Sequence, residues 1–168
     1  MRFVEANGRR RILMYALLIP PLALLLRGYS GGSSAAANSV AAVNLRRAQA
    51  RWARSGVRDY AYTLRVFAFG LGVGRPARVT VQNGRRISIA PADGNPKPLE
   101  TDGRVFPPYD TVDDLFGVVQ QAIDTRADRL DVEYDPVLGY PTEIEIDYIR
   151  LAADDELGVA VSKFEATR

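Results

Sequence analysis

Hydrophobic residues recur along the chain with two periods, one typical of helices and one typical of strands. Residues 39–56 have helical spacing, with Leu45, Ala48 and Trp52 on one stripe and arginines on the other faces. Residues 60–67 instead alternate between two faces, which is the pattern of a strand. An amphipathic helix that leads into a strand is therefore predicted.

The segment ARVTVQNGRRISIA, residues 77–90, is predicted to be a hairpin. A two-residue Asn-Gly turn would place Val81 opposite Arg86, an apolar residue against a polar one. A three-residue turn from Gln82 to Gly84 pairs apolar residues with one another and gives the glycine the left-handed conformation of a bulged turn. We therefore expect the three-residue turn.

A proline- and glycine-rich segment, residues 91–110, is predicted to be a long loop between two sets of elements. Thr111 after it has the character of a helix N-cap, with Asp114 three residues further on and apolar residues at helical spacing behind. Three stretches with strand alternation follow, at residues 130–135, 141–149 and 158–165.

Each half of the chain is thus a helix followed by three strands. The predicted fold class is α+β, an antiparallel sheet of about six strands covered by two helices, in the order helix-β-β-β-helix-β-β-β. The repeated order suggests a duplication, although residue identity between the halves is weak. Residues 38–168 are expected to form a single domain. The predicted core anchors are Trp52, Leu64, Leu115, Ile144 and Ile146.

The N-terminal segment has the order of an export leader. Arginines between Arg2 and Arg11 precede the apolar run 12–26, and small and polar residues follow it. The run of 15 residues is interrupted by Pro20-Pro21, and as a helix it would span about 22 Å, less than the roughly 30 Å hydrocarbon core of a bilayer. We therefore expect an exported protein in the periplasm, at the cell surface or outside the cell.

Residues 1–37 are expected to be the leader and a flexible linker, and two fates of the leader remain open. Ala35–Ala37 supplies the small residues that a signal peptidase reads, which would leave a chain starting at Asn38. Arg27, directly after the apolar run, instead suits a retained segment 12–26 that anchors the chain in the membrane. Membrane contact is expected through this N-terminal segment only.

Charge is divided unequally along the chain. Residues 1–90 carry 15 arginines and two acidic residues, whereas residues 91–168 carry seven basic and 18 acidic residues. Without residues 1–37 the net charge is −2, so no nucleic-acid partner is expected.

The sequence contains no histidine and no cysteine. This composition excludes Ser-His-Asp and Cys-His catalysis, zinc sites of the usual ligand sets and disulfides, and no cofactor is expected. Carboxylate chemistry, a Ser-Lys pair or a metal site with oxygen ligands remain. Ser162 and Lys163 are adjacent in a predicted strand and point to opposite faces, so they cannot form a dyad with each other.

The most distinctive stretch is YDPVLGYPTEIEID, residues 134–147. Its Asp-Pro pair is expected to start a turn, and the Gly-Tyr-Pro that follows is expected to set the backbone conformation where the turn ends. The tyrosine of that triplet could pack over the turn or extend toward a ligand. The candidate residues for a ligand or partner surface, from this stretch and the acidic segment behind it, are Tyr134, Asp135, Tyr140, Pro141, Asp147, Asp154, Asp155 and Glu156.

Parity in the same hairpin predicts an acidic surface. If the apolar residues of both strands are buried, the acidic residues of both strands lie on the opposite face. Like charges opposite one another across strands are destabilising. We therefore expect compensation from Arg65, Arg78 and Arg86, or incomplete compensation that recruits a cation or a basic partner. The six carboxylates are those of Asp131, Glu133, Asp135, Glu143, Glu145 and Asp147.

A spaced set of residues runs through the chain: Trp52, Tyr60-x-Tyr62, Val79-x-Val81-x-x-Gly84, the YDP-x-x-GYPT-x-I-x-ID run and Asp154-Asp155-Glu156. This set resembles the signature of a bacterial exported, lipoprotein-like domain of unknown function, and the YDP run is its most specific part. The resemblance extends from Trp52 to near the end of the chain. It implies export and one compact domain, and it implies no catalytic residue. The chain lacks the cysteine to which a lipoprotein's lipid is attached.

The leading interpretation is a non-catalytic, exported cell-envelope module that binds an envelope protein, a glycan or a cationic ligand. One alternative is a carboxylate-dependent hydrolase, such as a glycoside hydrolase that uses two of the acidic residues in the candidate set. A calcium-binding envelope protein with ligands from Asp154, Asp155 and Glu156 is another, although the spaced ligands of a calcium loop are absent.

Overall fold

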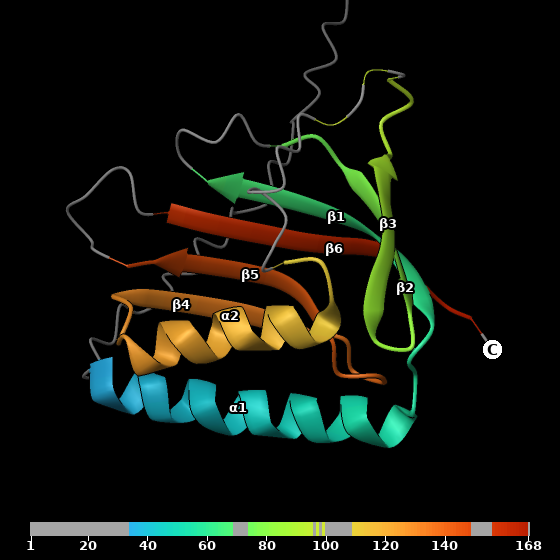
Figure 1. Ribbon diagram of the computed structural model, residues 1–168. Helices are drawn as coiled ribbons and strands as arrows, with labels where there is room; N and C mark the ends of the chain where they lie inside the picture. Colours follow the sequence, from blue (N-terminus) through green and yellow to red (C-terminus); the bar gives the residue numbers. More distant parts are fainter. Residues whose placement is uncertain are drawn as a thin grey trace, which may run out of the picture. The chain divides into compact units, whose positions relative to one another are not determined.

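Two helices and six strands make up the part of the chain that the structure describes (Figure 1). The structure is a computed structural model, and it describes residues 34–68, 74–95, 97, 99, 109–148 and 156–167. The elements are α1 (Ser34–Ser55), β1 (Tyr60–Ala68), β2 (Ala77–Gln82), β3 (Arg85–Pro91), α2 (Val112–Asp124), β4 (Arg129–Tyr134), β5 (Pro141–Asp147) and β6 (Glu156–Ala166). The predicted α+β class and element order are confirmed.

The six strands form one antiparallel sheet in the order β3-β2-β1-β6-β5-β4. The central pair is β1 with β6, and the edge strands are β3 and β4. Each half contributes three adjacent strands in the same internal order, β3-β2-β1 and β6-β5-β4. The duplication that the element order suggested stays a prediction.

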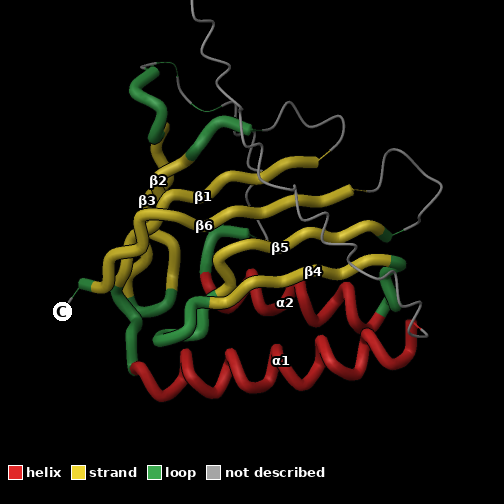
Figure 2. The backbone as a smooth tube through the Cα atoms, turned by 180° about the vertical axis from the view of Figure 1, so that it is seen from behind, coloured by secondary structure: helices red, strands yellow, loops and turns green. Residues whose placement is uncertain are grey.

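Both helices cover the same face of the sheet, called the inner face below (Figures 1 and 2). Helix α1 contacts α2 and β4, and α2 contacts β4 and β5. The apolar phase of each strand points toward the helices, because burying it removes the largest hydrophobic area from water. The predicted anchors Trp52, Leu64, Leu115, Ile144 and Ile146 are all buried.

Helix α2 begins as the sequence predicted. The Thr111 side chain accepts a hydrogen bond from the N–H of Asp114 at 3.1 Å, which satisfies one of the free amides of the first turn. A second amide is satisfied from the sheet: the N–H of Val112 donates to the Tyr60 hydroxyl at 3.0 Å. The start of α2 is therefore fixed to β1 as well as to its own cap.

Helix α1 begins at Ser34, five residues before the start expected from the hydrophobic stripe. The alanine-rich sequence there has high helix propensity, which extends the helix beyond the residues that pack. The start of the helix lies within the expected leader and linker, and residues 1–33 with the apolar run 12–26 lie outside the described residues. Among the described residues no helix is long and apolar enough to cross a bilayer.

An aromatic cluster joins α1 to the sheet, and it consists of Trp52, Tyr60, Tyr62, Tyr140 and Phe164. The Phe164 ring lies 4.2 Å from that of Tyr140 and 5.3 Å from that of Tyr60, both stacked, and the Trp52 ring meets Tyr60 edge-on at 5.4 Å. A bulge at Lys163, whose φ is +49°, breaks the alternation of β6. Phe164 thereby reaches the inner face.

The β2–β3 turn differs from the expectation. The turn contains two residues, Asn83 and Gly84, with φ of +50° and +74°, and Val81 lies opposite Arg86. An apolar residue is thus opposite a polar one, as the two-residue turn requires. A bulge at Ile87, between the pairs Thr80–Ser88 and Val81–Arg86, restores the match of apolar residues further along the strands. The predicted three-residue turn is therefore wrong. The left-handed conformation of both turn residues suits Asn-Gly, and it matches the twist of the strands.

Candidate interaction surface

The turn between β4 and β5 is held by its own backbone and by one carboxylate. Asp135 Oδ1 accepts hydrogen bonds from the N–H groups of Val137 at 2.9 Å and Leu138 at 2.6 Å. The N–H of Asp135 donates to the carbonyl of Tyr140 at 2.8 Å, and the N–H of Gly139 donates to the carbonyl of Asp135 at 3.0 Å. One oxygen of the Asp135 carboxylate therefore stabilises the turn.

Two other candidate residues of the turn, Tyr140 and Pro141, are buried. Tyr140 belongs to the aromatic cluster, and burial raises the pKa of its hydroxyl above the ordinary value. Tyr134 is half-buried against the core, and burial raises its pKa to about 12, although the nearby Arg51 charge lowers it. The structure thus places the rings of Tyr134 and Tyr140 in packing positions.

Two further candidate residues, Asp147 and Glu156, lie at the other end of the hairpin. Asp147 is half-buried and lies opposite Glu156 of β6, which is exposed. Among the described residues, Asp147 Oδ1 is buried without a hydrogen-bond partner. Asp154 and Asp155 lie outside the described residues. The described candidate residues are therefore divided between the two ends of β4 and β5.

The predicted acidic surface is present on the outer face of the sheet, opposite the helices. The cross-strand pairs Asp131–Glu145 and Glu133–Glu143 join β4 to β5. Asp135 was expected on this surface, but β4 ends at Tyr134 and the aspartate lies in the turn. The acidic face, as the term is used below, consists of Asp131, Glu133, Glu143, Glu145, Asp147 and Glu156.

Compensation by arginines of the first three strands was expected, and two of them have other partners. Arg78 forms an ion pair with Glu165 of β6, and Arg86 forms one with Asp110 before α2. The Arg65 guanidinium lies over the Phe67 ring, 5.8 Å from its centroid. The expectation for Arg78 and Arg86 is therefore wrong, because each forms an ion pair with an acidic residue outside the β4–β5 hairpin.

The cation within the acidic face comes from β4 itself. Arg129 Nε donates to Asp131 at 2.7 Å, and its Nη2 donates to Glu145 at 3.0 Å. The hydrogen bond with Asp131 and then the charges of Asp131 and Glu145 raise the pKa of Arg129. Sequence reasoning missed this residue, although its spacing of two from Asp131 places both on one face of a strand.

No ion pair to Glu133 or Glu143 is present in the described part of the chain. The next residue across the sheet from Glu143 is Ala160 of β6, followed by Arg65 of β1. Two strand spacings of about 4.8 Å separate the backbones of Glu143 and Arg65. The carboxylates of Glu133 and Glu143 thus lie opposite each other without a close cation.

The outer face of β6 presents small residues beside these carboxylates. Gly158, Ala160 and Ser162 follow one another on this face. The Phe67 ring packs over Gly158, where an added Cβ would lie 3.5 Å from the Phe67 Cβ, and Phe67 remains 46% exposed. The acidic face is therefore bordered by a strip of small residues on β6 and by the exposed aromatic ring of Phe67.

A second concave surface lies between the two helices. A groove of about 470 Å³ is lined by residues that include Trp52, Phe116 and Gly117, with Gln49, Asp113 and Gln120 as its polar groups. No group of three or more carboxylates among the described residues is arranged to hold a metal ion. The groove offers an apolar floor but no cluster of catalytic side chains.

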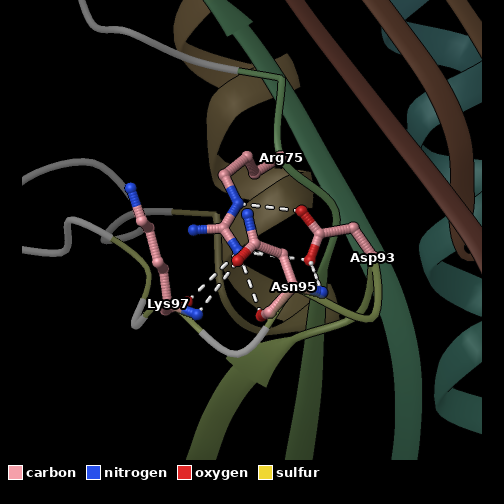
Figure 3. Close-up of polar contacts among 4 residues, drawn as sticks. All are labelled: Arg75, Asp93, Asn95 and Lys97. Carbon is pink, nitrogen blue, oxygen red and sulfur yellow. Dashed lines mark hydrogen bonds and ion pairs between the residues drawn. The ribbon is translucent and has the colours of Figure 1, made fainter.

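The beginning of the long loop after β3 is ordered by one arginine (Figure 3). Arg75 donates two hydrogen bonds to the Asp93 carboxylate, at 2.8 and 3.1 Å, and one to the carbonyl of Lys97 at 3.2 Å. Asp93 also accepts from the N–H of Asn95 at 3.1 Å. The hydrogen bond from Arg75, and then that from Asn95, lowers the pKa of Asp93 to about 2.

Comparison with known proteins is informative at the level of the family. No curated protein and no solved structure matches the chain. The model of a family of unknown function, DUF6174, matches residues 44–166, which span α1 from its middle, the whole sheet and α2. The chain therefore belongs to this family of unknown function.

Proposed function

We propose that the domain is a non-catalytic binding module of the cell envelope, and that its acidic face engages a partner rich in lysine or arginine. The observation that carries this proposal is the pair Glu133–Glu143, whose carboxylates lie opposite each other on exposed strand positions without an ion pair in the described part of the chain. Arg129 is shared by two other carboxylates.

Opposed like charges reduce the stability of the sheet by about 0.2–1 kcal/mol for each pair. A basic partner that binds between the strands would remove this repulsion and gain charge-assisted hydrogen bonds. Because the free fold is destabilised by the repulsion, binding is coupled to a gain in stability. The acidic face is thus better suited to a cationic surface than to a neutral glycan.

The border of the acidic face supports the same proposal. Small side chains at Gly158 and Ala160 allow a partner's backbone to come close to β6. Phe67 adds an exposed ring, and aromatic side chains are enriched in protein interfaces. No specific observation among the described residues favours a hydrolase or a calcium site.

The test is thermal unfolding of the full chain with and without poly-L-lysine. The wild-type melting temperature should rise with poly-L-lysine at low ionic strength, and the effect should disappear at high salt. The double variant Glu133→Gln plus Glu143→Gln should be more stable than wild type without ligand and should lose most of the response. Asp113→Asn plus Asp124→Asn, on the exposed side of α2, is the control with the same change in net charge.

An equal rise in melting temperature in both double variants would mean that poly-L-lysine binding depends on net charge only. This result would refute the assignment to the acidic face. No response in wild type, together with an unchanged stability of the Glu133 and Glu143 variant, would make this face an ordinary balanced surface.

Export is the second part of the proposal, and it is supported by the leader sequence of residues 1–37. Mass spectrometry of the protein recovered from its host should give a chain that starts near Asn38, or an intact N-terminus in the membrane fraction if segment 12–26 is retained. An intact chain found only in the cytosol would refute export.

A further inference from the structure

Helix α1 carries a group of basic residues that have no acidic partner in the described part of the chain. The helix contains four arginines and no acidic residue. Of these, Arg46, Arg47 and Arg54 are exposed, and no ion pair to any of them is present among the described residues. Two arginines of the sheet, Arg78 and Arg86, are instead paired with acidic residues.

The three arginines lie on the side of α1 that faces away from the sheet. Leu45, Ala48 and Trp52 mark the buried side of the helix, and Arg46, Arg47 and Arg54 fall on the opposite side at 100° per residue. Ala50 lies between Arg46 and Arg54 in the helical projection and Val40 lies next to Arg47, at the edge of this side; both are exposed, Val40 at 61%. This side of the helix therefore combines cationic side chains with small apolar ones. Together Val40, Arg46, Arg47, Ala50 and Arg54 are called the α1 basic face.

The α1 basic face and the acidic face lie on opposite sides of the domain. The helices cover the inner face of the sheet (Figures 1 and 2). The acidic residues occupy the exposed, alternate positions of β4 and β5, and so project from the outer face. Such a separation of charge orients the domain in an electric field. Near a negatively charged surface, the α1 basic face turns toward the surface and the acidic face turns away.

The chain that precedes α1 limits the distance to a membrane. Seven residues separate the apolar run 12–26 from the start of α1 at Ser34. Seven residues span at most about 25 Å when fully extended. With segment 12–26 in the bilayer, α1 therefore starts close to the headgroups, on the side to which the domain is exported.

We propose that the α1 basic face docks on a bilayer that contains anionic phospholipids, and so holds the acidic face toward the aqueous side. This proposal rests on the export proposed above, and it extends membrane contact from the N-terminal segment to the folded domain. Arginines bind lipid phosphates by paired hydrogen bonds, and the apolar side chains on the same side of the helix enter the interface. A second copy of the chain, docking its acidic face on α1, is the competing occupant.

The test uses the full chain reconstituted into vesicles of phosphatidylcholine alone or with 30 mol% phosphatidylglycerol, a chosen composition of about one anionic lipid in three. The chain has no cysteine, so a fluorophore can be attached at a single Ala50→Cys or Glu143→Cys position, on opposite sides of the domain. Quenching by a lipid with a nitroxide headgroup reports which position lies at the surface.

The label at position 50 should be quenched more strongly in the anionic vesicles than in the neutral ones, and the label at position 143 should be quenched weakly in both. Replacing the arginines by Arg46→Gln, Arg47→Gln and Arg54→Gln should reduce quenching at position 50 to its level in neutral vesicles. The control Arg65→Gln, Arg85→Gln and Lys97→Gln removes the same charge elsewhere and should leave the quenching unchanged.

Equal quenching at position 50 in both kinds of vesicle, or an equal loss in the control variant, would overturn the proposal. Protection of the position-50 label that grows with protein concentration and is independent of lipid would mean that a second copy occupies α1, and would also overturn it. Neither result depends on the poly-L-lysine experiment, because the two tests address opposite faces.

Discussion

Gly139 lies directly against the backbone of Ala48, and this contact sets the spacing between the β4–β5 turn and α1. Gly139 has a φ of +89°, and an added Cβ would overlap the Ala48 carbonyl oxygen and lie 2.9 Å from the Arg51 Cβ. The glycine of the signature stretch is thus required for two reasons, its backbone conformation and the lack of space. Its neighbour Tyr140 is consequently held in the aromatic cluster.

Gly139→Ala should lower the free energy of unfolding through both effects. The left-handed conformation costs about 1–2 kcal/mol for alanine, and the overlap with α1 adds about 1–3 kcal/mol. Gly56→Ala is the matched control, because Gly56 has a φ of +65° but an added Cβ there meets nothing within 4 Å. Urea unfolding of the two variants separates the effects. An equal loss in both would show that α1 moves away without cost.

Trp52→Ala should lower the free energy of unfolding by about 3–5 kcal/mol. The indole is 8% exposed and touches three rings of the aromatic cluster, so truncation removes the aromatic contacts of α1 with this cluster. Trp52→Phe, which keeps an aromatic ring, should recover part of the loss. Thermal unfolding gives the comparison. Trp52 also borders the groove between the helices. If Trp52→Ala leaves the stability unchanged, the residue belongs to that surface and not to the core.

Tyr60→Phe tests the hydrogen bond that fixes the start of α2. The variant leaves the buried N–H of Val112 without its acceptor, which costs about 1–3 kcal/mol. Tyr134→Phe is the control. Tyr134 is half-buried, whereas Tyr60 is buried, and within the described part of the chain its hydroxyl makes no hydrogen bond, so this change should alter stability by less than about 0.5 kcal/mol. Faster amide exchange at Val112 should accompany the loss in the first variant only.

Much of the fold could be predicted because its sequence signals are local. The N-cap of α2, the alternation of β4 and β5 and the stripe that buries Leu45 and Trp52 each depend on a few neighbouring residues. The β2–β3 turn failed for the opposite reason. Its geometry is fixed by contacts with a distant segment, where the N–H of Gly84 donates to the carbonyl of Arg58 and that of Asn83 to the Asp59 carboxylate.

The candidate surface shows the same division. Parity in one hairpin was sufficient to place the carboxylates of Glu133 and Glu143 on one face. The partners of the arginines depend on strand order across the whole sheet, and Arg78 meets Glu165, 87 residues away in the chain. Sequence spacing carries no information about such a pair. Asp135 was misplaced because the strand ends one residue earlier than the alternation suggested.

The stability that the Arg75–Asp93 contact gives to the loop after β3 should depend on pH. The folded-state pKa of Asp93 is about 2, below the ordinary 3.8, because Arg75 and then the Asn95 amide bond to the carboxylate. A lowered folded-state pKa means that the charged form is favoured by folding. The stabilisation is therefore fully present above about pH 4 and is lost as the pH falls through the folded-state value near 2.

Carboxyl-carbon NMR titration should give a midpoint near 2 for Asp93 in the wild-type chain. Arg75→Gln removes the principal donor and should return the midpoint toward 3.8. Asp93→Asn should be less stable than wild type at neutral pH, and the difference between the two should shrink as the pH falls from about 4 to about 2. A wild-type midpoint near 3.8 would mean that the hydrogen bonds in Figure 3 do not persist in solution, and that the loop after β3 has no fixed start.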